Sequence, residues 1–294
     1  MKILSLCLFI ADKKYCLNLS RGMAEAGDEL QETNAIASLD ARRERIIENV
    51  DNTKDSAADS QQNCDDYEDE QEHDQLCDQL RKCLEDIPAC DMQLSLFSAA
   101  SSSYRQDSTL RPFPPMFLKD DFKDVESLAH LLNKIPHLET VKQNLDSGFL
   151  DLDSKLLKLL VWVLGGGNAN LKLRSLSEIE KNEVLKLKGI EHHPLPNYIL
   201  EVSTNQTRRW RQMIDSKKTY WAFHGSRLDN FYSILNYGLQ QHLNKTGLFG
   251  EGIYLCEDLG VCLTYSSQGL GWIKSRLGQR LSCVAVAQVK HNTK

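Results

Sequence analysis

The hydrophobic pattern of this 294-residue chain changes its period near residue 170. Before that point, apolar residues recur every three to four positions, as in DVESLAHLLNKI (124–135) and LDSKLLKLLVWVL (152–164), which is the spacing of amphipathic helices. After it, short aromatic and β-branched runs alternate with helical stretches, a pattern typical of a mixed sheet domain. We therefore predict an α+β chain in which an all-helical domain precedes a domain that contains a sheet.

The helical domain is predicted to cover residues 76–170. Apolar residues lie at helical spacing over residues 76–87, where Pro88 ends the run, and again over residues 92–104. The segment TLRPFPPMF (109–117) holds three prolines, so we expect an extended connector there.

The pattern after the helical domain predicts a helix and a linker over residues 171–196 and a second domain over residues 197–294. Within this second domain we expect an extended run at residues 198–202 and a short helix at residues 208–213.

The N-terminal part of the chain is strongly acidic. Residues 24–91 contain 21 acidic and 6 basic residues, for a net charge of −15. Large apolar side chains are rare over residues 24–75, so burial cannot offset the entropy cost of ordering them. We expect residues 1–75 to form an acidic, mostly disordered extension, either a solvating tail or a docking segment for a basic partner. Residues 92–294 carry a net charge of +6, which indicates no specific nucleic-acid partner.

The first residues, MKILSLCLFIADKKYC (1–16), place a lysine before a mostly apolar run at residues 3–11. This run is shorter than the roughly 20 residues that cross a bilayer. It has the length of a signal-peptide core, and the alternative is an atypical first segment of a chain that is not secreted. The nine cysteines are an odd number without paired short spacings, which favours a reducing compartment.

A possible metal cluster was considered at four residues of the first helical run, namely His73, Cys77, Cys83 and Cys90. The gaps of five and six residues between these cysteines differ from the short ligand spacings of zinc sites. We interpret the cysteines as ordinary free thiols and expect no metal.

The stretch YWAFHGSRLDNFYSILNYGL (220–239) predicts a buried strand followed by a helix. His224 and Gly225 lie at the junction, Ser226 and Asp229 have the spacing of a capping box, and Gly238 suits a helix C-cap. Such a junction offers unpaired backbone N–H groups and side-chain hydrogen bonds, and glycine allows a ligand to approach the main chain.

A second stretch, LNKTGLFGEGIYLCEDLGVCLTYSSQG (243–269), follows this junction. Its glycines predict a flexible loop that leads into a short strand at residues 253–255, which contains Tyr254. Tyr265 is expected on the short helix after that strand.

The two stretches together resemble the poly(ADP-ribose) polymerase superfamily, whose nicotinamide pocket uses an H-G-S/T turn, a G-x-Y strand and a second tyrosine on the next helix. The segments SLFSAASSSYRQDSTLRPFP and LSCVAVAQV extend the resemblance to residues 91–289, toward the tail-anchored mono-ADP-ribosyltransferases of the endoplasmic reticulum. The resemblance implies a regulatory-like helical domain and an ADP-ribosyltransferase-type split antiparallel sheet.

The resemblance also implies roles for single residues. His224 would hydrogen-bond ribose hydroxyls of NAD, Gly225 would pair its backbone with the nicotinamide carboxamide, and Ser226 would support the ribose. Tyr254 and Tyr265 would enclose the nicotinamide ring between their flat faces. His224 and Tyr254 are the expected catalytic residues, NAD is the expected co-substrate without a metal, and the expected partners are protein substrates, possibly including the chain itself.

Three features depart from the family pattern. Cys262, a weak hydrogen-bond donor, stands where many relatives have a serine that contacts the carboxamide. The family's third signature position, the remaining strands and the membrane anchor are expected downstream of LSCVAVAQV and outside these 294 residues. The acidic extension has no expected family counterpart. We expect the family member on the cytosolic face of the endoplasmic reticulum and this chain, as given, in the cytoplasm.

Two functions of different classes remain. One is an NAD-dependent protein mono-ADP-ribosyltransferase. The other is a catalytically inactive, truncated product that binds NAD or a protein partner without turnover.

Overall fold

The structure is a computed structural model. It describes residues 6–11, 59–148, 152–167, 171–190 and 193–290, except for residue 194, residue 206, residues 209–211, residues 213–218 and residues 241–251. Residues 1–12 and 75–294 belong to one compact unit, and residues 13–74 belong to another.

The helices that precede the sheet begin at side-chain caps for which the sequence is well suited. Asp124 accepts a hydrogen bond from the backbone of Ser127 at the start of α6, and Asp153 accepts bonds from two backbone N–H groups at the start of α8. The helices predicted at residues 124–135 and 152–164 are thus confirmed. The helices of this region are α3 (Asp59–Cys83), α4 (Ile87–Ser101), α5 (Gln106–Thr109), α6 (Val125–Lys134), α7 (Leu138–Ser147) and α8 (Ser154–Leu164).

A small hairpin interrupts the region that we predicted to be wholly helical. Strands β2 (Leu118–Lys119) and β3 (Phe122–Lys123) pair in antiparallel fashion. The two residues between them, Asp120 and Asp121, have φ values of 47° and 67°, as a two-residue type I′ hairpin turn requires. The proline-rich segment before them includes a single 3₁₀ turn, η2 (Pro115–Phe117), rather than a wholly extended connector, because proline fits the first turn of a helix.

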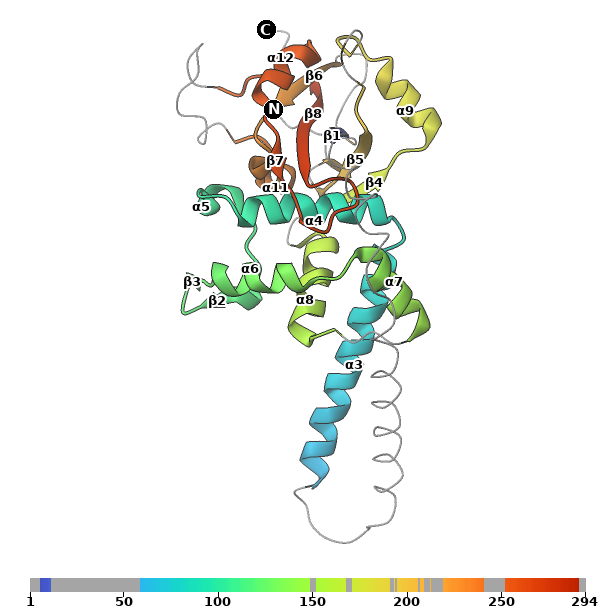
Figure 1. Ribbon diagram of the computed structural model, residues 1–294, viewed down its shortest axis with the longest axis vertical. Helices are drawn as coiled ribbons and strands as arrows, with labels where there is room; N and C mark the ends of the chain where they lie inside the picture. The colour runs from blue at the N-terminus through green and yellow to red at the C-terminus, as the bar shows by residue number, and fades with distance from the viewer. Residues whose placement is uncertain are drawn as a thin grey trace, which may run out of the picture. The chain divides into compact units, whose positions relative to one another are not determined.

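Helix α4 lies between the sheet and the helices α6 and α8 (Figure 1). It is buried along most of its length, and the buried residues include the polar Asp91, Gln93 and Ser95. Phe97, which is fully buried, packs edge-on against Trp162 of α8 and Tyr232, with ring centroids 6.2 and 5.2 Å apart. Tyr104, which we placed on the apolar face of this run, lies beyond the end of α4 and is 81% exposed.

Among the residues that the structure describes, the main sheet has six strands, and all of its pairs are antiparallel. Its order is β4-β5-β1-β8-β6, and β7 also pairs with β8. The strands, in chain order, are β1 (Leu6–Ala11), β4 (Lys172–Ser175), β5 (Tyr198–Ser203), β6 (Thr219–Gly225), β7 (Gly269–Leu270) and β8 (Arg280–Lys290). Strand β5 confirms the predicted extended run, whereas the helix predicted at residues 208–213 lies largely outside the described residues.

The expectation of a mostly disordered extension over residues 1–75 is wrong at two places. Residues 6–11 form β1, whose backbone pairs with a strand on each side. Residues 59–75 belong to α3, because a helix extends at little cost once its neighbouring turns are formed. The other residues of the predicted extension lie outside the described residues.

The two faces of the sheet pack against different helices. Cys283 and Ala285 of β8 belong to the large core that contains α4 and α11 (Leu228–Tyr237). Val284 and Val286, which alternate with them, belong to a smaller core on the other face. That core also contains α12 (Leu259–Tyr265) and α9 (Glu178–Leu185). Because α4, α6, α7 and α8 share the larger core with the sheet, they belong to one compact unit with it.

The segment 171–189, which we predicted as one helix, contains β4 before α9. Leu173 is buried between the exposed Lys172 and the partly exposed Arg174, an alternation that suits a strand. Ser177 and Glu180 then form a capping box that starts α9. The helix therefore begins later than the apolar spacing indicated.

Candidate functional site

The site predicted from sequence begins where β6 ends and α11 begins. Strand β6 ends at Gly225, and α11 starts at Leu228 and ends at the predicted C-cap, Gly238, with a φ of 78°. The predicted capping box of Ser226 and Asp229 is wrong, because the N-cap residue is Arg227 and its side chain makes no capping bond. The serine and the aspartate are engaged by other side chains, as described below.

His224 is fixed by a hydrogen bond to the neighbouring segment. Its Nδ1 lies 2.9 Å from the backbone carbonyl oxygen of Tyr254. Burial lowers the pKa of His224, although the bond to Tyr254 acts in the opposite direction, so the ring is neutral at pH 7. A carbonyl oxygen can only accept a hydrogen bond, so Nδ1 carries the proton and Nε2 keeps its lone pair. The ring therefore presents a hydrogen-bond acceptor at Nε2.

The lowered pKa of His224 predicts how stability depends on pH. Near and below its unfolded pKa of about 6.5, the ring of His224 binds fewer protons in the folded chain than in the unfolded chain. Well above that pH the ring is neutral in both states and does not change the unfolding free energy. As the pH drops through this value, protonation of the unfolded chain lowers the unfolding free energy. We expect His224→Gln to lose less unfolding free energy than the unmodified chain between about pH 7.5 and pH 5.5. Urea unfolding of both chains at the two pH values measures the difference, and equal losses would contradict the assignment.

Tyr254 lies on a segment that touches β6 without forming a strand. Cys256 and Phe223 exchange two backbone hydrogen bonds of 2.7 and 3.0 Å, and this pair is an isolated bridge. The short strand predicted at residues 253–255 is therefore wrong. Its ladder does not continue, because the carbonyl of Tyr254 is taken by the side chain of His224.

Gly225 packs directly against α12. A β-carbon at this position would overlap the carbonyl oxygen of Cys262 and lie 2.8 Å from Oγ of Ser266, so glycine is required by this close approach. Tyr265, the last residue of α12, is 64% exposed. The predicted helix after Tyr254 is therefore present and carries Tyr265, and it lies against the glycine of the junction.

Cys262 is the buried residue of α12 that faces this glycine. Burial raises the pKa of its thiol to about 11, although hydrogen bonding with the backbone of Gly225 lowers it in part. The residue is thus a neutral thiol at pH 7, which is a weaker hydrogen-bond donor than the serine hydroxyl of many relatives.

Asp229 joins the site to the helical region. Its carboxylate accepts a hydrogen bond from Oγ of Ser103 at 2.7 Å and two from Arg227 at 3.0 and 3.1 Å. Burial raises the pKa of Asp229, but the hydrogen bonds from Arg227 and Ser103 outweigh it and hold the pKa below its usual value. The aspartate is therefore charged and anchors the first turn of α11.

Asn230 makes the second link. It donates to Oγ of Ser226 at 2.8 Å and accepts from the guanidinium of Arg105 at 2.9 Å. Ser226, the third residue of the predicted junction, is thus oriented through Asn230 by a residue more than 100 positions earlier in the chain. Sequence reasoning did not assign this network a role, because no local pattern pairs Ser103 or Arg105 with α11.

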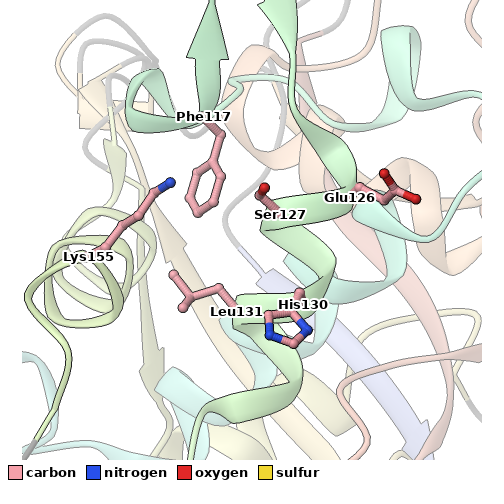
Figure 2. Close-up of a pocket in the computed structure, with 6 residues that line it drawn as sticks. All are labelled: Phe117, Glu126, Ser127, His130, Leu131 and Lys155. Carbon is pink, nitrogen blue, oxygen red and sulfur yellow. The ribbon is translucent and has the colours of Figure 1, made fainter.

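A separate hollow of about 360 Å³ lies in the helical region (Figure 2). In Figure 2 the side chain of Lys155 extends toward the ring of Phe117, and its Nζ lies 4.4 Å from the ring centroid. None of the sequence-predicted site residues lines this hollow, so we do not assign it to the dinucleotide. Its lining residues are Phe117, Glu126, Ser127, His130, Leu131 and Lys155.

Among the residues that the structure describes, no three His, Cys, Asp or Glu side chains gather as metal ligands. Cys77, Cys83 and Cys90 form no disulfide bond, and the thiol of Cys90 donates to the carbonyl of Cys83. Among the described residues, no helix combines the length and the apolar composition that a membrane span needs.

A helical region, an antiparallel sheet and a His-Gly-Ser junction backed by a short helix are the features expected of a fold of the ADP-ribosyltransferase type. Comparison with known families agrees: residues 178–293 match the poly(ADP-ribose) polymerase catalytic domain, and residues 70–164 match the ARTD15 N-terminal domain. The chain belongs to the poly(ADP-ribose) polymerase superfamily.

Two relatives are protein mono-ADP-ribosyltransferase PARP16 of Mus musculus and of Homo sapiens. Over 208 residues, this chain is 39% identical to the mouse protein and 40% identical to the human protein. The aligned part covers 69% of this chain and 63% of each relative.

Proposed function

We propose that this chain is an NAD-dependent protein mono-ADP-ribosyltransferase, which transfers ADP-ribose from NAD to protein side chains and releases nicotinamide. The observation that carries the proposal is the neutral His224, whose Nδ1 is held by the carbonyl of Tyr254 at the His-Gly-Ser junction. This contact leaves Nε2 as an acceptor for a ribose hydroxyl. The name of the mouse and human relatives supports the same activity.

The residues of the junction would bind NAD and orient its nicotinamide and ribose groups. Gly225 would pair its backbone N–H and C=O with the nicotinamide carboxamide, Ser226 would support the ribose, and the rings of Tyr254 and Tyr265 would enclose the pyridine ring. In the reaction the bond from the ribose to nicotinamide breaks, its electron pair leaves with nicotinamide, and a nucleophile of the target protein bonds to the ribose and loses its proton to water. The protein contributes orientation and fixed dipoles near the developing positive charge, and the proposal includes no metal.

The proposed partners are protein substrates, and the chain itself is one candidate acceptor. No disulfide bond joins the cysteines whose side chains the structure describes, which is compatible with a reducing compartment. Together with the family resemblance, this observation supports a site of action on the cytosolic face of the endoplasmic reticulum for the full-length family member and in the cytoplasm for this chain as given.

A second candidate function is a module that binds NAD or a protein partner without turnover. It is favoured by Cys262, whose neutral thiol is a weaker donor than the serine of many relatives. A carboxamide held less firmly would reduce transfer more than binding.

Labelling with a tagged NAD analogue tests the proposed activity. We expect the chain to become labelled or to label an added protein. His224→Ala should lower the labelling rate about 10- to 100-fold, because a hydrogen bond between the neutral imidazole and the ribose is lost. His130→Ala, at an exposed histidine of α6, is the matched control and should label normally. Equal labelling by the unmodified chain and His224→Ala would contradict the enzyme, and NAD binding without any labelling would favour the binding module.

A further inference from the structure

Tyr104 is an exposed aromatic residue that no step of the proposed reaction uses. It lies in the turn between α4 and α5, outside both helices, and it is 81% exposed. Exposed turns are the parts of a fold that another enzyme reaches most easily. The phenol oxygen of Tyr104 is therefore accessible to an enzyme that modifies tyrosine.

Two guanidinium groups flank the ring of Tyr104. The guanidinium carbon of Arg105 lies 5.6 Å from the ring centroid, and that of Arg227 lies 5.7 Å from it. Arg105 follows Tyr104 in the turn, whereas Arg227 is the N-cap residue of α11. Two cations beside one phenol form a setting that stabilises a negative group attached to that phenol.

The two arginines are held with different strength. Arg227 donates two hydrogen bonds to the buried carboxylate of Asp229. Arg105 donates to the neutral amide oxygen of Asn230 at 2.9 Å, and its Nε is buried without a hydrogen-bond partner in the described part of the chain. A phosphate carries a charge of about −1.5 to −2, and its hydrogen bonds with a guanidinium are about twice as strong as those between neutral groups. A phosphate on Tyr104 would therefore compete for Arg105 more effectively than for Arg227.

Asn230 connects Arg105 to the candidate site. The amide nitrogen of Asn230 donates to Oγ of Ser226 at 2.8 Å, while its amide oxygen accepts from Arg105. If Arg105 turns away, the amide loses the bond that fixes its plane, and Ser226 loses its fixed orientation. The turn that contains Tyr104 thus has a physical route to the His-Gly-Ser junction.

We propose that Tyr104 is a phosphorylation site for a tyrosine kinase, and that its phosphate binds Arg105 in place of Asn230 and so releases Ser226. In this step Oη of Tyr104 bonds to the γ-phosphorus of ATP and the bond from that phosphorus to its bridging oxygen breaks. ADP leaves with the electron pair, and a base of the kinase takes the phenolic proton. The effect of the phosphate on NAD rests on the proposed function, whereas the release of Ser226 does not.

Phosphorylation by a broad-specificity tyrosine kinase with ATP tests the accessibility of Tyr104. A synthetic peptide of residues 98–110, in which Tyr104 is the one tyrosine, is the reference. We expect the folded full chain to be phosphorylated at Tyr104 within about tenfold of the peptide's rate, because an exposed turn opens at little cost. Mass spectrometry locates the phosphate and measures both rates. A rate in the folded chain below this range would overturn the proposal.

Nuclear magnetic resonance of the Asn230 side-chain amide tests the second half of the proposal without any use of NAD. The signal is assigned by its absence in Asn230→Ser, and Arg105→Ala shows where it moves when the bond from Arg105 is lost. Phosphorylation should move the signal in the same direction and at least about half as far, and a phosphatase should return it. Kinase-treated Tyr104→Phe is the matched control and should leave the signal in place.

An unmoved Asn230 signal in the phosphorylated chain would overturn the proposal. Loss of signals from the buried core would also overturn it, because the phosphate would then unfold the chain instead of acting through Arg105. A chain that shows the expected shift but never labels with NAD would contradict the proposed enzyme and leave the phosphorylation site intact.

Discussion

Gly225→Ala is expected to destabilise the chain by about 3 kcal/mol, because overpacking against backbone atoms forces the chain to shift. The added β-carbon would overlap the carbonyl oxygen of Cys262, which is part of the α12 main chain and cannot rotate away. Either α12 or the end of β6 must therefore move. Both carry residues of the candidate site, so the labelling expected of the proposed function should be lost as well.

The prediction for Gly225 is checked by urea unfolding together with the labelling assay. Gly252→Ala is the matched control for stability, because a β-carbon there would meet no atom within 4 Å. We expect this control to unfold within about 0.5 kcal/mol of the unmodified chain. A Gly225→Ala chain of unchanged stability would show that α12 does not pack on the junction.

The junction itself could be predicted from sequence because its signals are local. The aromatic run before His224, the apolar spacing after it and Gly238 all lie within twenty residues, and β6, α11 and its C-cap were confirmed. The capping box failed because the charged Arg227 competes for Asp229 within the same turn, and Ser103, just beyond the end of α4, also donates to it. The sequence spacing of a capping box does not reveal that Arg227 and Ser103 also bind Asp229.

The features that depend on distant partners could not be predicted. The segment that becomes β1 has an apolar composition that equally suits a signal peptide, and what fixes it as a strand is pairing with residues about 190 and 280 positions later. The short strand expected around Tyr254 failed for a related reason, since the side chain of His224 takes the carbonyl that a longer ladder would use. Long-range pairing decides both cases.

Helix α4 joins the two regions that match family domains. The helical region was predicted as a separate domain, yet α4 contacts α8 on one side and α11 on the other. The rings of Phe97, Trp162 and Tyr232 bring these three helices together. Ser103 and Arg105, just beyond the end of α4, then reach α11 through Asp229 and Asn230. Apolar and polar contacts thus connect the helical region to the strand–helix junction.

Phe97→Ala is therefore expected to lower the unfolding free energy by about 3–5 kcal/mol, the usual cost when a fully buried phenylalanine is replaced and a cavity remains. Phe97 has no exposed surface and makes edge-on contacts with two aromatic rings. Phe122→Ala is the matched control, since Phe122 is 79% exposed, and it should change stability by at most about 0.5 kcal/mol.

The loss of stability in Phe97→Ala should affect both of the regions that match a family domain. If the helical region and the sheet unfold together, the amides of α8 and of β8 should lose protection from hydrogen exchange by the same free energy in Phe97→Ala. Mass spectrometry of peptides from the two elements measures both values in one sample. A loss confined to α8 would show that the helical region opens alone, and the contacts of α4 with α11 would then not couple it to the strand–helix junction that carries His224 and Gly225.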